Sequence, residues 1–313
     1  MFKIEPLDKN HYDNWNRVVI NSKNGNFLFL IDYFKYHEVR FEDASLIIYK
    51  KQIPVAVFPA NTDNETIYSH NGLTYGGLIY GKELHTKDIL SIFDLIKEHY
   101  LKNGCKKMIY KCIPDVFKKY PSNEDLYALF INKAKLIRRD LSSVIELDKR
   151  PKLSDSRKNV IRKADKNNIL IRPSDDFRCF HELLSGVLAK FNATPIHSSD
   201  EMKLLSSKFP ENIKLYTALK DDSLIAGCIV YDFGHIVHTQ YLASNEVGRN
   251  TGALDAILNS LINNVYHEKK YFSFGISTEN SGYYLNEGLI AQKEGFGGRG
   301  VTHDFYEWDF NNR

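Results

Sequence analysis

The sequence predicts an α/β (α+β) protein made of two tandem domains with the same order of elements. The chain has 313 residues, which is enough for two domains of ordinary size. Residues 45–147 indicate, in order, a strand pair, a loop, a helix, a strand, a helix and a strand. Residues 213–310 repeat this order. We therefore expect each domain to hold a mixed, mostly antiparallel sheet flanked by helices.

Composition and charge narrow the functional class. Hydrophobic residues make up 43% of the chain and charged residues 26%, which is typical of a soluble globular protein. The formal net charge of +3 is too small to favour DNA as a partner. The four cysteines lack CxxC or CxxH spacing, so neither a metal site nor a disulfide framework is expected. No apolar leader or membrane span is found in the sequence, and we expect a cytoplasmic protein.

The first domain is expected over residues 1–148. Asp8 can cap a helix in which Trp15 and Val18 lie on one face. Pro54 stands near the start of its strand, where a missing N–H is tolerated. The expected strands cover residues 2–7, 45–50, 53–60, 66–69, 106–111 and 135–147, and the expected helices cover 12–19, 33–36, 86–100 (capped by Thr86) and 124–133.

The second domain, residues 149–313, is expected to start with a basic linking helix at about 154–167. Ser154 can cap this helix, and Val160, Ile161 and Ala164 can face inward. Nine cations lie between residues 149 and 172, against Asp155 and Asp165. Such a surface is either a solvated helix face or an anion site in which arginine grips phosphate or carboxylate. Interleaved aromatic residues are absent, so single-stranded nucleic acid fits poorly.

The centre of the second domain is a strand, loop and helix between residues 213 and 276. Three apolar strands, at 213–220, 224–233 and 236–244, precede a polar glycine-bearing loop at 245–252. A helix at 253–268 and a strand at 271–276 follow. A loop that opens a helix presents N–H groups and the positive end of the helix dipole, which favours phosphate. The loop alternatively serves turn geometry alone. The candidate cofactor-binding residues are Gly248, Arg249, Asn250, Thr251 and Gly252.

The C-terminal part completes the second repeat. We expect a helix at about 284–294 and a strand at 301–310. The glycines between residues 295 and 300 most simply end that helix.

Four stretches together resemble one known family. They are the hairpin at 46–60 followed by Tyr75-Gly76-Gly77, the helix Arg157-Lys158-Asn159-Val160-Ile161-Arg162-Lys163-Ala164, the strand–loop–helix core, and the tail Phe272–Ser277 with Lys293-Glu294-Gly295-Phe296-Gly297. In this order they resemble the FemABX-like branch of the GNAT acyltransferase superfamily. The resemblance covers nearly the whole chain and implies two tandem GNAT-like domains.

Three departures bear on the chemistry. The family often has Asp before Phe-Gly in the strand at 271–276, where this chain has Ser273. The general GNAT loop is R/Q-x-x-G-x-G/A; Arg249 and Gly252 fit it, but Leu254 occupies the last position. The chain also lacks the long charged helical hairpin that is common in peptidoglycan-bridge enzymes using aminoacyl-tRNA.

The resemblance implies an N-acyltransferase that uses acyl-CoA, for example acetyl-CoA, as co-substrate. The acceptor would be an amino group on an anionic small molecule, such as a nucleotide-linked sugar or peptide of cell-envelope biosynthesis. One alternative is a FemABX-type enzyme that uses aminoacyl-tRNA. Another is a degenerate GNAT pair that acts as a non-enzymatic binding module. The acceptor and the oligomeric state are left open by the sequence.

Candidate catalytic residues follow from the chemistry of acyl transfer. Lys293, at the position of a functional lysine in the family, could stabilise developing negative charge; an exposed lysine in the last helical turn is the alternative. His238 and Tyr241 could transfer protons, although their spacing on a regular strand places them on opposite faces. Tyr283, with Tyr284, is a further proton donor.

Candidate substrate-binding residues come from the resemblance alone. It implies that Tyr75, Gly76, Arg157 and Arg162 line a groove between the domains, where they would meet a phosphate or carboxylate of the acceptor. A metal is not expected.

Overall fold

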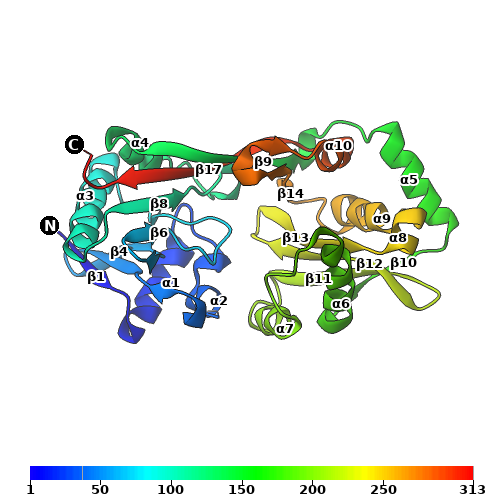
Figure 1. Ribbon diagram of the computed structural model, residues 1–313, viewed down its shortest axis with the longest axis horizontal. Coiled ribbons are helices and arrows are strands. Elements are labelled where there is room, and N and C mark those ends of the chain that lie inside the picture. Colours follow the sequence, from blue (N-terminus) through cyan, green and yellow to red (C-terminus); the bar gives the residue numbers. More distant parts are fainter. Residues whose placement is uncertain (37, 313) are drawn as a thin grey trace. The chain divides into compact units, whose positions relative to one another are not determined.

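The computed structural model describes residues 1–36 and 38–312 and divides into two compact units. Unit 1 consists of Met1–Asp140, Asn280–Tyr283 and Thr302–Arg313, and unit 2 of Leu141–Glu279 and Tyr284–Val301. Two long strands, β9 (Lys135–Glu146) and β17 (Arg299–Asp309), have residues in both units (Figure 1). The prediction of two tandem α/β domains is confirmed, and the boundary at residue 148 stays a prediction.

The first sheet of unit 1 is antiparallel throughout. Its strands follow the order β1 (Phe2–Pro6), β3 (Leu46–Lys50), β4 (Ile53–Phe58) and β7 (Ile79–Tyr80). Lys51 and Gln52, which join β3 to β4, both have positive φ, at 50° and 67°. Positive φ at both residues matches the twist of a two-residue hairpin, so the strands pair closely.

The second group of strands in unit 1 contains a parallel pair. Strand β8 (Lys107–Lys111) lies between β17, which is antiparallel to it, and β6 (Thr66–Tyr68), which is parallel. Strands β5 (Asn61–Asp63) and β2 (Glu42–Asp43) continue the sheet beyond β6. The helix α3 (Thr86–Lys102) precedes β8 in the chain, as a parallel connection requires.

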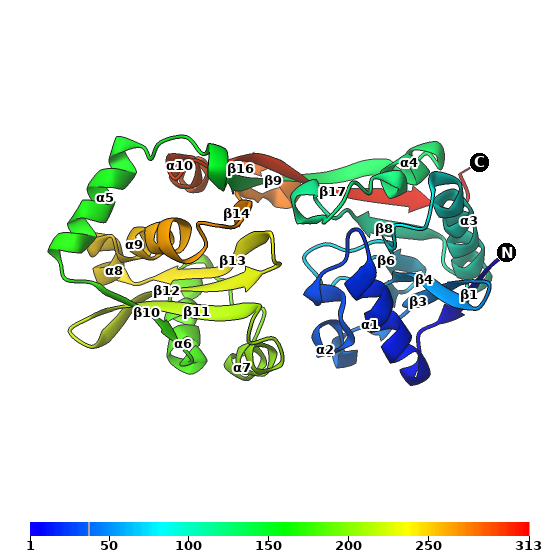
Figure 2. The same ribbon diagram turned by 180° about the vertical axis from the view of Figure 1, so that it is seen from behind.

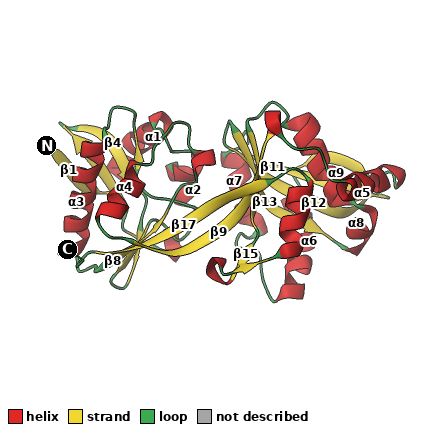
Figure 3. Ribbon diagram, turned by 90° about the horizontal axis from the view of Figure 1, so that it is seen from above, coloured by secondary structure: helices red, strands yellow, loops and turns green. Residues whose placement is uncertain are grey.

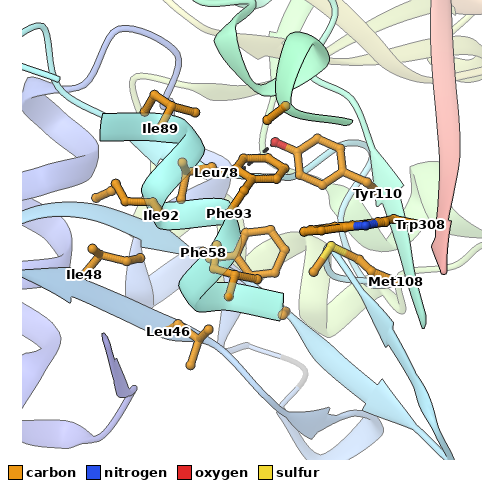
Figure 4. Close-up of a cluster of buried hydrophobic side chains, with 14 of the residues drawn as sticks. Leu46, Ile48, Phe58, Leu78, Ile89, Ile92, Phe93, Met108, Tyr110 and Trp308 are labelled. Carbon is orange, nitrogen blue, oxygen red and sulfur yellow. Dashed lines mark hydrogen bonds between the residues drawn. The ribbon is translucent and has the colours of Figure 1, made fainter. Parts of the chain in front are cut away.

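The core of unit 1 fills with aliphatic and aromatic side chains from both groups of strands. Helix α3 contributes Ile89, Ile92 and Phe93, which recur at helical spacing. The ring of Phe93 stacks on Trp308 of β17 with 5.6 Å between the ring centroids (Figure 4). The other helices of this unit are α1 (Tyr12–Asn21), α2 (Ile31–Phe34) and α4 (Glu124–Ile131).

Unit 2 is built on six neighbouring strands of a larger sheet. Their order is β10 (Leu170–Ser174), β11 (Ile213–Lys220), β12 (Ser223–Asp232), β13 (Ile236–Ser244), β14 (Tyr271–Ile276) and β9. All neighbours are antiparallel except β13 and β14, which are parallel. The sheet is therefore mixed and mostly antiparallel, as predicted.

Helices cover both faces of this sheet. Helix α9 (Ala253–Ser260) lies on one face, while α6 (Phe177–Leu188) and α7 (Ser199–Lys208) lie on the other (Figures 1 and 2). A Cβ on Gly227 of β12 would stand 2.6 Å from the ring of Phe180, so α6 packs directly on the sheet. Helices α5 (Asp155–Lys166) and α8 (Glu246–Thr251), seen from above in Figure 3, and α10 (Glu287–Gly295), labelled in Figure 1, complete the unit.

Several elements differ from the sequence expectations. The expected loop at 245–252 is mostly the helix α8, because the Asn245 side chain caps it. The expected helix at 253–268 ends at Ser260 and continues as a π-helical turn, Leu261–Val265. Helix α10 starts only at Glu287, and the short strands β15 (Thr278–Glu279) and β16 (Tyr284–Leu285) precede it. Thr86 is the first residue of α3, and His85 takes the cap position. Strand β10 and helices α6 and α7 were not predicted.

The cysteines of the described residues are all free thiols. Cys105, Cys112 and Cys228 are buried thiols, and Cys179 is exposed. In the described part of the chain, every helix is too short or too polar to span a bilayer.

Candidate active site in unit 2

The candidate site lies where β13 and β14 stop pairing. These parallel strands are in register over three positions, which end with His238 opposite Ser273. Beyond this pair, β13 continues along β12 to Ser244, whereas β14 meets β9 again at Ile276 after a break in register. The two strands therefore open from each other after His238, and their main-chain groups border the opening.

A β-bulge in β13 changes which side chains share a face. Tyr241 is opposite Ile229 and Thr239 is opposite Val230, which leaves Gln240 as an extra residue. A bulge shifts the alternation of side chains by one position. His238 and Tyr241 therefore lie on the same face of the sheet, and the expectation of opposite faces is wrong.

The side chain of His238 contacts β14 at the point where the two strands begin to separate. Its Nδ1 lies 3.0 Å from the hydroxyl oxygen of Ser273. A Cβ on Gly275 would stand 3.2 Å from Cε1 of this ring, and Gly275 has a φ of +76°. Glycine is therefore required twice at position 275, by its backbone conformation and by the closeness of the imidazole.

Tyr241 is already engaged by a second histidine. Its hydroxyl lies 2.5 Å from Nδ1 of His197, a buried residue just before α7. Burial raises the pKa of Tyr241 to about 12, so the phenol stays protonated at neutral pH. The hydrogen bond to His197 ties β13 to the segment before α7 and so gives Tyr241 a structural role.

Lys293 is buried and points at the end of β14. Only 4% of its surface is exposed, although it lies in the last turn of α10. Its ammonium donates hydrogen bonds to the carbonyl oxygens of Gly275, at 2.9 Å, and Ile276, at 2.6 Å. Burial lowers the pKa of Lys293 to about 8. An ammonium has three N–H groups, so two of the three serve the main chain.

The junction of α8 and α9 is less open than the predicted phosphate loop. The N–H of Gly248 donates to the side chain of Asn245, and the N–H of Arg249 donates to the main-chain carbonyl of Asn245. The N–H of Gly252 donates to the main-chain carbonyl of Arg249. The hydroxyl of Thr251 donates to the main-chain carbonyl of Val247. The guanidinium of Arg249 donates to the carbonyl of Ser244.

Helix α5 packs on this junction. Gly252 has a φ of +77°, and a Cβ there would stand 2.6 Å from the carbonyl oxygen of Val160. Arg157 of α5 forms an ion pair with Asp255 in the first turn of α9, with 2.5 Å between Nη1 and Oδ1. Arg162, by contrast, is exposed and donates to Asn159 of its own helix.

Tyr75, Gly76 and Tyr283 belong to unit 1. Tyr75 is 2% exposed, and its hydroxyl accepts a hydrogen bond from Asn26. The N–H of Gly76 donates to the carbonyl of Lys111. Tyr283 is 88% exposed. Their proposed roles stay predictions.

Of the predicted residues, the structure brings His238, Tyr241 and Lys293 to the two strands that border the opening. Ser273, Gly275 and Asp255 were not predicted as site residues. Asp255 had a detectable signal, since it stands three residues after Gly252 in the first turn of a helix. In the described residues, His, Cys, Asp and Glu side chains form no group of three suited to a metal ion.

The fold of this chain is similar to that of several solved structures, although its sequence matches no known family. Neither a protein-family model nor a curated protein matches the sequence. The solved structure of FemX is similar over 98% of this chain and 97% of its own, with a TM-score of 0.71 and 10% identity. L-PGS from Bacillus licheniformis is similar over 99% and 94%, with a TM-score of 0.64 and 9% identity. A tandem GNAT protein from the clavulanic acid biosynthesis pathway covers both chains fully, with a TM-score of 0.55 and 10% identity.

These likenesses span the whole chain at low identity, so they bear on architecture. They include both FemX and a tandem GNAT protein, in agreement with the resemblance found in the sequence. The chain therefore has the FemABX-like tandem GNAT fold.

Proposed function

We propose that this protein is an N-acyltransferase whose reaction takes place at the opening between β13 and β14. The observation that carries the proposal is the buried Lys293, whose ammonium stands at the carbonyl groups of Gly275 and Ile276 where the strands separate. A fixed cation in a site of low dielectric stabilises an oxyanion far more than it would in water.

The proposed reaction forms one amide bond. The nitrogen of an amine acceptor attacks the acyl carbonyl carbon, and the bond from that carbon to the sulfur or oxygen of the donor breaks. Lys293 stabilises the carbonyl oxygen through its third N–H. His238 accepts the proton that the amine loses, and the leaving group takes up a proton from water.

The acceptor is expected to be anionic. The family resemblance suggests an amino group on a nucleotide-linked sugar or peptide of cell-envelope biosynthesis. Arg162 supports this expectation, because its guanidinium is exposed and donates a hydrogen bond to the neutral amide of Asn159 on its own helix. Arg157 gives weaker support, since Asp255 already neutralises it.

Two donors are candidates. Acyl-CoA is the donor that the GNAT resemblance implies, with Gly248–Gly252 as the phosphate-binding residues. Aminoacyl-tRNA is the second candidate. The packing of α5 on Gly252 favours it, because the main-chain N–H groups of Gly248, Arg249 and Gly252 already have acceptors within the chain.

The experiment is a transfer assay with both donors. Purified protein is incubated with acetyl-CoA or with charged tRNA, together with a set of nucleotide-linked amino sugars and peptides, and products are detected by mass. We expect one donor class to give an amide product that Lys293→Met fails to form. A product formed equally by the variant would contradict the assigned site. Failure of every donor to react would favour the binding-module alternative.

A further inference from the structure

The first turn of α9 contains a carboxylate side chain, that of Asp255. Asp255 is the third residue of this helix, where the aligned peptide dipoles favour negative charge. The residue is 7% exposed. Its carboxylate pairs with Arg157, whose side chain is 20% exposed. A paired carboxylate and guanidinium thus lie at the first turn of α9.

Two further contacts hold α5 against the start of α9 and the end of α10. The carbonyl of Val160 lies so close to Gly252 that even one additional carbon atom would collide with it. The N–H of Ser154 donates to the carbonyl of Gly295, which ties the first turn of α5 to the end of α10. Helix α5 is thus fastened at its start by Ser154 and Arg157, and in its middle by Val160.

We propose that Asp255 determines donor specificity: held by Arg157, it excludes the pyrophosphate of a coenzyme A donor from the start of α9. This inference rests on the proposed acyl transfer, because it describes how the donor of that reaction is selected. The donor it favours is an acyl ester or thioester that carries no pyrophosphate at this helix. Recognition then depends on the acyl group and the atoms next to the reacting carbonyl.

The test measures anion binding without any turnover. Inorganic pyrophosphate and coenzyme A are titrated by calorimetry into the full-length wild type, Asp255→Ala and Asp255→Asn. Removing the carboxylate leaves Arg157 without its partner, and one charge-assisted hydrogen bond to an anion changes affinity by roughly 10-fold to 100-fold. We expect pyrophosphate to bind Asp255→Ala at least about tenfold more tightly than the wild type.

The matched control is Asp155→Ala. Asp155 pairs with Lys158 on the same helix, but its side chain is 92% exposed. The control should leave the affinity for pyrophosphate at the wild-type value. Asp255→Asn keeps the side-chain volume, so it should fold even where Asp255→Ala does not, and should bind more weakly than Asp255→Ala but more tightly than the wild type.

Two results would overturn the inference. One is wild-type protein that binds coenzyme A with an affinity that Arg249→Ala weakens, because the junction would then accept a pyrophosphate as it stands. The other is unchanged pyrophosphate affinity in both folded Asp255 variants. Neither result depends on acyl transfer, so failure of the inference is distinguishable from failure of the proposed function.

Discussion

Lys293 donates a hydrogen bond to the main-chain carbonyl of Ile276 across 2.6 Å, and so joins the last turn of α10 to the end of β14. A buried ammonium is unfavourable unless its N–H groups find acceptors, and two carbonyls supply them here. The same contact sets one border of the opening beside β13. The lysine is therefore both a support for the strand and the proposed electrophilic group.

Replacing Lys293 should separate these two roles. We expect Lys293→Met to lower kcat by about 10²–10³, the usual loss when one oxyanion donor is removed. The thermal unfolding temperature, measured in parallel, reports the support of β14. A variant that loses stability but retains the wild-type kcat would leave Lys293 with the structural role alone.

The proposed role of Lys293 also predicts a pH dependence. Its pKa of about 8 means that the ammonium loses its proton as the pH rises through 8. The neutral amine cannot stabilise an oxyanion, so kcat should fall above pH 8. Lys293→Arg keeps the charge at all these pH values, and this fall should disappear in the activity that remains. An identical alkaline limb in wild type and Lys293→Arg would assign it to another group.

His238 and Tyr241 provide a matched pair on one sheet face. His238→Ala should lower kcat by about 10²–10⁴, as expected on loss of a general base. Tyr241→Phe removes only the hydroxyl that contacts His197, and we expect kcat to change by less than about threefold if that contact is structural. The opposite order of effects would make Tyr241 the proton-transfer residue.

Gly252 tests how closely α5 packs on α9. Gly252→Ala meets both a φ of +77° and the Val160 carbonyl, whereas Gly234→Ala meets a φ of +92° in open space. We expect Gly234→Ala to reduce the free energy of unfolding by about 1 kcal/mol, and Gly252→Ala by about 2–4 kcal/mol. Urea denaturation of both variants measures the difference. An equal loss of unfolding free energy in both variants would show that α5 can shift away from position 252 at little cost.

Lys111 in unit 1 predicts a pH dependence of stability. It is buried, donates to the carbonyls of His70 and Leu73, and has its pKa lowered to about 7 by burial. The unfolded lysine has a pKa near 10.4, so between pH 7 and 10 the unfolded chain binds the additional proton and stability rises with pH. Lys111→Met removes this contribution. Its free energy of unfolding should therefore rise less than that of the wild type over this range, and parallel curves would contradict the assignment.

The order of elements was predictable because it depends on local patterns. Apolar alternation and turn residues located the strands β11, β12 and β13, and helical spacing located α9. The side chains at the site depend on pairing between distant segments. The bulge at Gln240 arises from the register of β13 on β12, and no local signal in the sequence reports it.

Long-range contacts also explain the difference at the predicted phosphate loop. Its glycines and arginine lie in α8 and at its junction with α9, where Asn245 and Val160 decide whether the N–H groups and the helix start are accessible. Val160 lies 92 positions before Gly252, so their contact is set by the tertiary fold. Lys293 can likewise be buried only because the carbonyls of Gly275 and Ile276, in the distant strand β14, accept hydrogen bonds from its ammonium.

Hydrogen–deuterium exchange shows whether an acyl donor binds at the opening between β13 and β14. Exchange is measured with and without acetyl-CoA, and with and without a stable analogue of the aminoacyl end of tRNA. We expect slower exchange at residues 238–244 and 273–277 with one of these donors, and a smaller effect in Lys293→Met. Protection confined to residues 1–140, or none with either donor, would contradict it.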